Sequence, residues 1–317
     1  MRVLVCGASG QDGAYLSQFL LKKGHEVIGT SRDALGGSSH NLRTLGINRD
    51  IKLASMVVSD FRSVFSTIKR FNPDEIYNLT GQTSVNLSFD QPVESIDSIA
   101  IGTLNLLEVI RLFNPKIRFY NAGSSECFGS AKKGSSFNER SGFYPRSPYG
   151  VAKSAAAMLV QNYRESYAIY ACTGILFNHE SPLRPNRFVT KKIVNAAYRI
   201  SQGSKEKLEL GNIDICRDWG WAPEYVEAMW KMLQMKKSSD YVIATGRSES
   251  LCYFATQVFK HFELDLKKYL KINPEFFRPS EILYSCGDAS KANKDLKWKA
   301  KTDIDGIIKN LCLAVKN

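Results

Sequence analysis

The sequence contains little of what a metal centre, a disulfide framework or a membrane anchor requires. Only four histidines occur, at the widely spaced positions His25, His40, His179 and His261. The seven cysteines are scattered and form no CxxC pair, which fits reduced thiols better than a disulfide framework or a zinc site. No apolar run approaches the ~18 residues of a membrane-spanning helix, and the apolar stretch at the N-terminus is too short for a signal peptide. We therefore expect a cytoplasmic protein with no metal site and no membrane contact.

Composition and charge narrow the class further. With 317 residues, 44% hydrophobic and 23% charged, the chain is typical of globular proteins, so disorder, collagen and coiled coil are excluded for the whole. The length predicts two domains or one large α/β body. The formal net charge of +12 could serve a nucleic acid or a polyanionic small substrate. Because the positive residues are dispersed, with no basic stripe interleaved with aromatics, we expect no nucleic-acid partner.

Strand and helix patterns alternate along the first half of the chain. Strands are predicted at 3–5, 27–29, 51–53, 75–79 and 117–121, and helices at 14–23, 61–71 and 93–113, with Gly24 ending the first helix. Residues 34–50 are rich in Gly, Ser and Asn and indicate a loop with little structure. The alternation predicts an α/β fold, a Rossmann-type doubly wound parallel sheet with helices on both faces.

The second half of the chain is less regular. Helices are predicted at 148–167, 188–202 and 222–235, mixed with short strands at 173–177 and 241–244. No internal repeat or low-complexity linker marks a clean boundary. We expect a main domain of residues 1–178 and 212–244, and a smaller, interwoven α/β C-terminal lobe of residues 179–211 and 245–317.

A glycine turn follows the first strand. Gly7, Gly10 and Gly13 form G-x-x-G-x-x-G, with Gln11 and Asp12 at the start of the next helix. The missing side chains let a pyrophosphate approach the backbone, and the helix N-terminus offers unpaired N–H groups and a positive dipole end. At the first strand–helix junction of an alternating chain, this pattern indicates a dinucleotide site, so the main domain is predicted to bind the dinucleotide.

The end of the second strand bears on the choice between NAD and NADP. NAD enzymes usually place an acid there for the ribose hydroxyls, whereas NADP enzymes place a cation for the extra phosphate. Arg32 can pair a phosphate and Ser31 can donate to it, while Asp33 points to the opposite choice. We expect NADP, with NAD as the alternative. Asp60 is placed to reach the adenine amino group, or else to cap a helix.

A second chemical motif lies in the middle of the chain. Tyr149 and Lys153 form Tyr-x-x-x-Lys on a predicted helix, so both side chains project from one face. A nearby ammonium lowers the pKa of a phenol, which lets the tyrosine act as a base towards an alcohol. Ser124, Ser125 and Glu126 follow the strand predicted at 117–121, and ligands bind beyond the carboxyl ends of such strands. The combination predicts a redox or proton-transfer site.

Together these motifs give the chain a family resemblance. It resembles the extended short-chain dehydrogenase/reductases and, within them, the GDP-mannose 4,6-dehydratase family. The stretches that carry the resemblance are Gly-Ala-Ser-Gly-Gln-Asp-Gly at 7–13, Phe-Tyr-Pro-Arg-Ser-Pro-Tyr at 143–149, Asn-Tyr-Arg-Glu-Ser-Tyr at 162–167, Gly-Ile-Leu-Phe-Asn-His-Glu-Ser-Pro at 174–182, Phe-Val-Thr-Lys-Lys-Ile at 188–193, Arg-Asp-Trp-Gly at 217–220, Val-Ile-Ala-Thr-Gly at 242–246 and Phe-Arg-Pro-Ser-Glu at 277–281.

The resemblance implies a lyase that works through an internal redox cycle. Tyr149 takes the proton of the sugar 4-hydroxyl while hydride leaves C4 for the nicotinamide, and Glu126 then removes the C5 hydrogen and helps expel the 6-hydroxyl as water. Hydride returns to C6, which gives a 4-keto-6-deoxy sugar. Ser124 bonds the 4-oxygen, Lys153 lowers the pKa of Tyr149 and holds the nicotinamide ribose, and Leu79 contacts the cofactor.

The resemblance also implies a nucleotide-sugar site. Its residues are Ser84, Ser125, Asn178, Glu180, Lys192, Arg217, Arg278 and Glu281. Two arginines and a lysine suit a diphosphate, because guanidinium groups make paired, charge-assisted hydrogen bonds to phosphate oxygens. Ordinary surface pairing is the alternative for the arginines. His179, with no metal partners nearby in sequence, is predicted to be structural.

Several positions depart from the family pattern and leave the sugar open. Thr83-Ser84 replaces a Ser-His pair, Cys127-Phe128 replaces Leu-Tyr, residues 183–187 replace an Arg-Arg-Gly run, and Trp221 replaces His. A changed pocket could admit another GDP-sugar, such as a GDP-manno-heptose. The altered loop after Arg32 favours a dimer over a tetramer. A reductase or 4-epimerase of the same fold, and a non-catalytic binding protein, stay as alternatives; neither needs Glu126.

Overall fold

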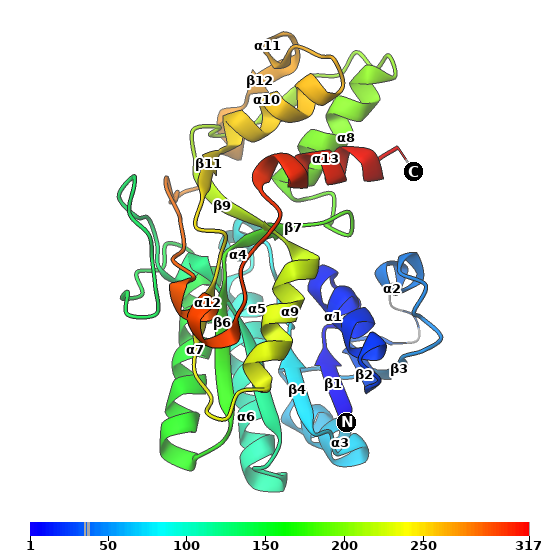
Figure 1. The fold of residues 1–317 in the computed structure, drawn as a ribbon, viewed down its shortest axis with the longest axis vertical. Helices are drawn as coiled ribbons and strands as arrows, with labels where there is room; N and C mark the ends of the chain where they lie inside the picture. Colours follow the sequence, from blue (N-terminus) through cyan, green and yellow to red (C-terminus); the bar gives the residue numbers. More distant parts are fainter. Residues whose placement is uncertain (35, 37–38, 317) are drawn as a thin grey trace.

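A seven-stranded sheet forms the centre of the computed structural model, which describes residues 1–34, 36 and 39–316 (Figure 1). The strands run in the order β10-β6-β5-β4-β1-β2-β3 and all neighbours are parallel. Their bounds are β1 Arg2–Cys6, β2 Glu26–Ser31, β3 Lys52–Ser55, β4 Glu75–Asn78, β5 Arg118–Ser124, β6 Ala171–Leu176 and β10 Tyr241–Ile243. The predicted Rossmann-type fold class is confirmed.

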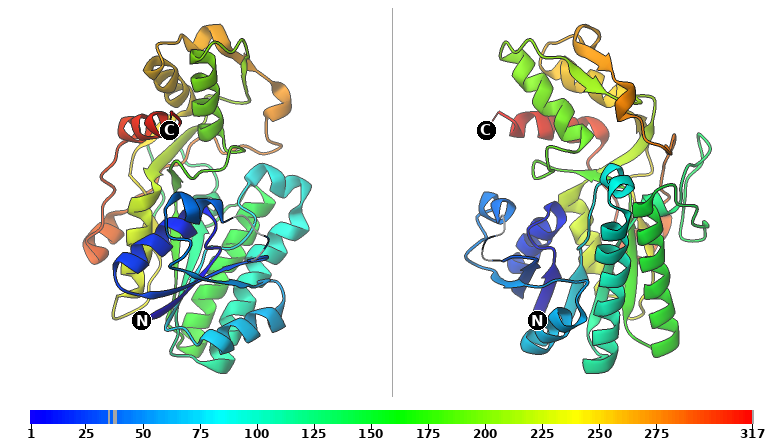
Figure 2. Two further views of the ribbon diagram at one scale, coloured as in Figure 1. Left: turned by 90° about the vertical axis from the view of Figure 1, so that its right-hand side faces the viewer. Right: turned by 180° about the vertical axis from the view of Figure 1, so that it is seen from behind.

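Helices cover both faces of this sheet, because alternate side chains of a strand point to opposite faces. Val3 and Val5 of β1 pack with α1 Gln11–Lys22 and α9 Ala222–Leu233. Leu4 and Cys6 alternate with these two valines along β1. They pack with α3 Phe61–Phe71, α6 Gly102–Phe113 and α7 Pro148–Tyr167 on the other face. The two layers are visible from the side and from behind in Figure 2. The near-continuous apolar strands are therefore those of a sheet buried on both sides.

The predicted boundaries need three corrections in the body. The expected helix at 93–113 is α5 Pro92–Ile96, a π-helical turn Asp97–Ile101 and then α6, with α4 Val85–Asp90 ahead of it. Ile99 of the π turn packs in the same apolar cluster as Tyr149. The loop expected at 34–50 contains the short helix α2 His40–Thr44; its residues 35, 37 and 38 lie outside the described part. The fifth strand runs on to Ser124.

The lobe lies at the carboxyl end of the sheet strands, at the top of Figure 1. It contains β7 Asn178–Glu180, α8 Val189–Ser201, β8 Leu208–Leu210, β9 Cys216–Trp221, β11 Ser248–Ser250, α10 Leu251–His261, α11 Leu266–Tyr269, β12 Leu270–Ile272 and α13 Ile304–Ala314. β9 pairs with both β7 and β11, and β8 pairs with β12. Helices α8, α10 and α13 enclose a separate apolar cluster that includes Ile193, Phe254 and Ile307.

Packing adjusts the domain boundaries that we propose for the chain. Ile215 and Trp219, placed in the main domain by sequence, lie in the cluster of the lobe. Ala292, Leu296 and Trp298, placed in the lobe, pack with α1 and α9 of the body, and α12 Ser290–Leu296 lies beside α9 in Figure 1. We therefore propose that β9 goes with the lobe and that α12 goes with the body. No helix within the described ranges is long and apolar enough to cross a membrane.

Candidate active site

The glycine turn joins β1 to α1 at the carboxyl edge of the sheet. Gly7 has φ +85°, and a Cβ there would lie 2.8 Å from the carbonyl oxygen of Leu79. A Cβ on Gly13 would lie 2.2 Å from the carbonyl oxygen of Gly7, so the helix can pack on the turn only through glycine. Gly10 caps α1 without a side-chain hydrogen bond, so no side-chain oxygen occupies the N-cap position. The turn thus has the form of a cradle for a pyrophosphate.

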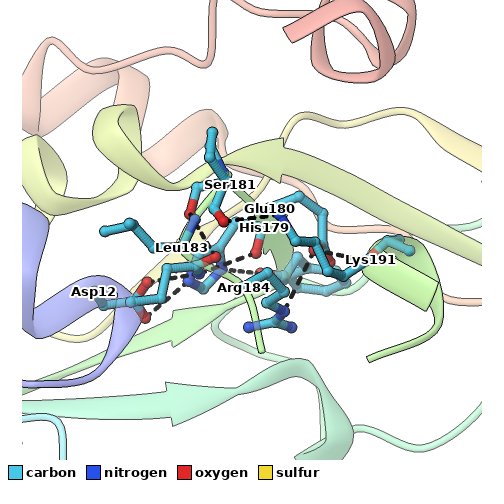
Figure 3. A network of polar contacts seen from close by, with 11 residues as sticks. Asp12, His179, Glu180, Ser181, Leu183, Arg184 and Lys191 are labelled. Carbon is cyan, nitrogen blue, oxygen red and sulfur yellow. Dashed lines mark hydrogen bonds and ion pairs between the residues drawn. The ribbon is translucent and has the colours of Figure 1, made fainter. Parts of the chain in front are cut away.

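The side chains of Gln11 and Asp12 connect this turn to the segment after β6, and Figure 3 shows Asp12 beside His179. Gln11 Nε2 donates to Asp12 Oδ1 at 3.0 Å and to the carbonyl oxygen of His179 at 3.3 Å, and Ser181 Oγ donates to Gln11 Oε1 at 2.8 Å. His179 Nε2 lies 2.9 Å from Asp12 Oδ2, and His179 Nδ1 lies 2.7 Å from the Phe177 carbonyl oxygen. The geometry leaves the backbone of Gln11 and Asp12, rather than their side chains, for the cofactor.

The Asp12–His179 pair is electrostatically coupled. Burial alone would raise the pKa of Asp12, but His179 and the Gln11 amide overcome it and lower the pKa to about 2. Burial alone would lower the pKa of His179, and Asp12 overcomes it, so the pKa of His179 is raised. The pair connects the glycine turn to the lobe, and we refer to it as the Asp12–His179 strut. These contacts are the structural role predicted for His179.

The two side chains after β2 that bear on cofactor choice, those of Arg32 and Asp33, lie in different surroundings. Arg32 is 82% exposed in its side chain and lies 3.7 Å from Glu94 of α5. A small cavity beside the glycine turn is lined instead by Asp33, together with Ala8, Ser9, Thr30, Ser31, Ala34, Ser39, Leu42 and Leu53. Asp60 caps α3, with Oδ1 accepting from the Arg62 amide at 2.9 Å, which is the alternative role that the sequence allowed.

The catalytic candidates meet where β5 ends and α7 begins. Ser124 is the last residue of β5, and Glu126 lies in the 3-10 turn Ser125–Cys127 that follows. Tyr149 and Lys153 lie in the first turns of α7, which Ser147 caps by accepting from the Gly150 amide at 3.0 Å. A Cβ on Gly150 would lie 2.8 Å from the carbonyl oxygen of Glu126. Glycine at 150 therefore allows the helix to lie against the turn that carries the carboxylate.

Tyr149 and Lys153 are both almost fully buried. Burial raises the pKa of the Tyr149 phenol; a hydrogen bond with Ser124 acts in the opposite direction, and the charge of Glu126 adds to the rise. Lys153 Nζ donates to the carbonyl oxygen of Ala122 at 2.7 Å, and burial lowers its pKa to about 8. The pKa of the phenol is therefore raised in this structure, opposite to the direction expected from Tyr-x-x-x-Lys; Lys153 Nζ lies 5.9 Å from the centre of the ring.

Glu126 faces both halves of the molecule. Its charge raises the pKa of Tyr149 in the body and opposes the lowering, by burial, of the pKa of Arg217 on β9. Both groups therefore lie within electrostatic reach of this half-buried carboxylate. The structure thus brings Ser124, Glu126 and Tyr149 together at the edge of the sheet, with Arg217 across from them.

The predicted diphosphate cations form a cluster of their own. Arg217 is 5% exposed; its Nη1 donates to the carbonyl oxygens of Ile282 at 2.7 Å and Cys216 at 3.0 Å, and its Nη2 lies 3.3 Å from Glu281 Oε1. Arg278 Nη1 lies 3.5 Å from the same carboxylate oxygen. Arg217, Arg278 and Glu281 are therefore brought together, with the carboxylate holding both guanidinium groups in place.

The remaining predicted substrate residues use their side chains within the protein. Glu180 is 2% exposed, accepts from Thr190 Oγ1 at 2.7 Å and lies 3.3 Å from Arg184 Nε, which fits a positioning role. Lys192 Nζ donates to the carbonyl oxygen of Glu209 at 2.7 Å, and Ser84 caps α4. Ser125 is buried in the turn beside Glu126, and Asn178 is half-buried at the start of β7.

Sequence reasoning missed two arginines in the loop between β7 and α8. Arg184 lies close enough to Tyr149 and Asp12 to lower the pKa of each, and its guanidinium stacks 3.9 Å from the centre of the Phe188 ring. Arg187 Nη2 lies 3.3 Å from Thr83 Oγ1, in the segment between β4 and α4. The available signal was the pair of arginines shortly before Phe188, in a segment that departs from the family pattern.

Comparison with known proteins fits this geometry. Residues 4–311 match the family described as GDP-mannose 4,6 dehydratase. The chain is 44% identical to GDP-mannose 4,6 dehydratase 1 of Arabidopsis thaliana, covering 96% of this chain and 87% of that one, and 39% identical to the GDP-mannose 4,6-dehydratase of Vibrio cholerae, covering 94% and 89%.

Solved structures share the fold at lower identity. A dTDP-glucose 4,6-dehydratase of Bacillus anthracis in complex with NAD has a TM-score of 0.87 at 19% identity, covering 100% of this chain and 96% of that one. A UDP-glucose 4-epimerase of Thermotoga maritima with UDP-glucose has a TM-score of 0.88 at 21% identity, covering 100% and 99%. Because the family match spans nearly the whole chain, the protein belongs to the GDP-mannose 4,6-dehydratase family.

Proposed function

We propose that this protein is an NADP-dependent GDP-sugar 4,6-dehydratase that forms a GDP-4-keto-6-deoxy sugar. The position of Glu126 carries the proposal: this carboxylate lies within electrostatic reach of both the buried phenol of Tyr149 and the buried guanidinium of Arg217. A reductase or 4-epimerase needs the phenol but no second acid–base group beside it. A dehydratase needs both, because it must also take a proton from C5 and give one to the leaving 6-hydroxyl.

The residues divide the proton transfers between them. As the phenolate, Tyr149 accepts the proton of the sugar 4-hydroxyl while a hydride leaves C4, for which a bound nicotinamide would be the acceptor. Ser124, the hydrogen-bond partner of Tyr149, holds the 4-oxygen. The 4-ketone so formed makes the C5–H acidic, so Glu126 can remove that proton. Glu126 then returns a proton to the 6-oxygen, which leaves as water, and a C5–C6 double bond remains. Return of the same hydride to C6, and delivery to C5 of one proton that balances the proton taken up by Tyr149, complete the 4-keto-6-deoxy sugar.

The residues of the glycine turn fit a nicotinamide dinucleotide. The Cβ positions of Gly7 and Gly13 would collide with backbone, and the first turn of α1 has no capping side chain. The backbone from Gly7 to Gly13 would hold the pyrophosphate, Leu79 would border the cofactor, and Lys153 would bind its ribose. When bound, a nicotinamide supplies the acceptor and donor of hydride for such a cycle.

NADP is the form that we propose, with Arg32 as its phosphate ligand. An exposed ion pair at 3.7 Å contributes little, so Arg32 can exchange Glu94 for a phosphate at small cost. Asp33 in the neighbouring cavity supports NAD instead, so the two forms must be compared directly.

The test of the proposed reaction is mass analysis of the product. We expect loss of one water from a GDP-sugar, with GDP-hexoses and GDP-manno-heptoses compared in parallel with UDP-, CDP- and dTDP-hexoses. An isomerised product of unchanged mass would support a 4-epimerase instead. Binding of cofactor and GDP-sugar without turnover of any of them would support a non-catalytic protein.

We also propose a homodimer, with a tetramer as the alternative. Helices α6 and α7 lie side by side, as Figure 2 shows from behind, and expose Leu112, Val151 and Met158; Ile101, one residue ahead of α6, is also exposed. Val151 and Met158 are seven residues apart and share one helix face. An apolar stripe over two helices is typical of an interface. Light scattering after size-exclusion chromatography should give twice the chain mass, and Met158→Lys should give the monomer.

A further inference from the structure

One contact joins the lobe to the body at the mouth of the catalytic site. Arg187, in the loop from Ser181 to Phe188, places Nη2 3.3 Å from Thr83 Oγ1 in the segment between β4 and α4. Two residues after Thr83, Val85 packs in the cluster that contains Tyr149. Ser84, which the family resemblance places at the substrate site, follows Thr83 directly, so Arg187 contacts the segment expected to border the sugar.

Both ends of the contact are held in place by their own segments. On the lobe side, the Leu183 amide donates to Ser181 Oγ at 3.2 Å and Lys191 Nζ donates to the Pro182 carbonyl oxygen at 3.0 Å. Asn186 Oδ1 accepts from Asn195 Nδ2 of α8 at 3.0 Å. These bonds anchor the loop directly before Arg187 and limit the positions that the Arg187 side chain can take.

The body side is braced in the same way. Gln82 clamps the peptide of Ser84, with its amide nitrogen donating to the Ser84 carbonyl oxygen at 2.7 Å and its amide oxygen accepting from the Ser84 amide. Ser84 in turn caps α4. Thr83 lies between these two residues, so the position of its hydroxyl is set by the clamp.

The charge of Arg187 has no acidic counterpart within the described residues. Arg184, three residues earlier, lies 3.3 Å from Glu180, whereas Arg187 makes no ion pair there. A guanidinium carries five N–H donors and no acceptor, and one donor is directed to Thr83. Arg187 is exposed, so its remaining donors are open to water or to a ligand, and a sugar ring held at Tyr149 would present hydroxyl oxygens to them.

We propose that Arg187, oriented by Thr83, is a specificity-determining residue that binds hydroxyl oxygens of the sugar portion of the substrate. The proposal rests on the proposed GDP-sugar function and assigns the diphosphate to the separate Arg217–Arg278 cluster. Arg187 is a permanent donor, so it favours sugars with an acceptor hydroxyl on this side of the cleft. Because the hydrogen bond to Thr83 already orients the guanidinium, little side-chain freedom of Arg187 is lost on binding.

The experiment compares binding of GDP with binding of GDP-mannose by calorimetry, for wild type and Arg187→Ala. We expect Arg187→Ala to weaken GDP-mannose roughly tenfold or more, the effect of losing hydrogen bonds from a charged donor, and to leave GDP within about twofold. Thr83→Val, which keeps the shape and removes the acceptor, should weaken GDP-mannose less. Arg199→Ala, at the far end of α8 and paired with Glu206, is the matched control and should change neither ligand.

Kinetics sharpen the assignment. With GDP-mannose and a GDP-manno-heptose as substrates, Arg187→Ala should raise KM and change the ratio of kcat/KM between the two sugars. An equal loss for GDP and GDP-mannose would overturn the proposal and place Arg187 at the diphosphate. Unchanged binding of both would overturn it as well. If wild type binds GDP-mannose but removes water from no sugar, the proposed reaction fails while the calorimetry still decides the role of Arg187.

Discussion

On the body side of the site, Lys153 donates to a single carbonyl oxygen, and no side chain among the described residues donates a hydrogen bond to the Glu126 carboxylate. On the lobe side, Arg217 donates to two carbonyl oxygens and shares Glu281 with Arg278. The body holds its reactive groups by burial and by the start of α7. In the lobe, Arg217 and Arg278 are both held by contacts with the same carboxylate, that of Glu281. Under the proposed function, the catalytic groups have few internal hydrogen bonds, whereas the arginines proposed to bind the nucleotide-sugar already share a network of contacts within the protein.

The largest expected effect is on the body side. Glu126→Gln keeps the shape of the side chain but cannot move a proton between C5 and the 6-oxygen, so water loss should fall by orders of magnitude. Binding of cofactor and GDP should stay close to wild type, because neither is assigned to Glu126. Single-turnover mass analysis and calorimetry measure the two quantities.

A dehydration rate near that of wild type in Glu126→Gln would remove Glu126 from the mechanism and with it the contrast between the two regions. Glu165→Gln is the matched control. This exposed glutamate lies at the far end of α7, where it only accepts from Gln161.

On the lobe side, the variants Arg217→Met and Arg278→Ala distinguish an effect on GDP binding from an effect on the free energy of unfolding. Both should weaken GDP, since each removes a cation beside Glu281. Only Arg217→Met should also lower the free energy of unfolding, by roughly 2 kcal/mol, because it leaves buried carbonyl oxygens without a donor. Urea unfolding and calorimetry with GDP provide the measurements. Equal stability losses in both variants would show that the network does not depend on the buried member.

The two regions also differ in how far the sequence predicts them. Strand–helix alternation, the glycine turn and Tyr149-x-x-x-Lys153 are local patterns, and they predicted the sheet and the edge where the body-side groups meet. No local pattern could show that Glu180 bonds Thr190, that Gln11 and Asp12 turn towards His179, or that Arg187 reaches Thr83, since these contacts join segments that only tertiary packing brings together. Nor could spacing reveal that burial raises the pKa of Tyr149.

A smaller effect is expected where β2 ends. Arg32→Ala should weaken NADP about tenfold or more and change NAD little, because only NADP carries the phosphate that a guanidinium pairs. Glu94→Gln, which frees Arg32 from its exposed partner, should strengthen NADP slightly. Fluorescence titration with the reduced cofactors measures both. Equal losses for NAD and NADP in Arg32→Ala would leave Asp33 as the residue that sets cofactor choice.

The smallest effect concerns the Asp12–His179 strut between the two regions. The folded pKa of Asp12 is lowered from 3.8 to about 2, so its contribution to stability is present above about pH 4 and is lost as the pH falls towards 2. The folded pKa of His179 is raised above 6.5, so its contribution is present below pH 6.5 and is lost as the pH rises through the raised value. The strut should therefore stabilise most between about pH 4 and 6.5.

Thermal unfolding of His179→Gln across this range tests the strut. The loss of Tm relative to wild type should be greatest between about pH 4 and 6.5 and should shrink above it, because neutral His179 no longer attracts Asp12. His261→Gln is the control with the opposite sign, since burial lowers the pKa of His261, so its protonation destabilises the fold. A Tm difference for His179→Gln that does not vary with pH would mean that shape and hydrogen bonding, rather than charge, connect the glycine turn to the lobe.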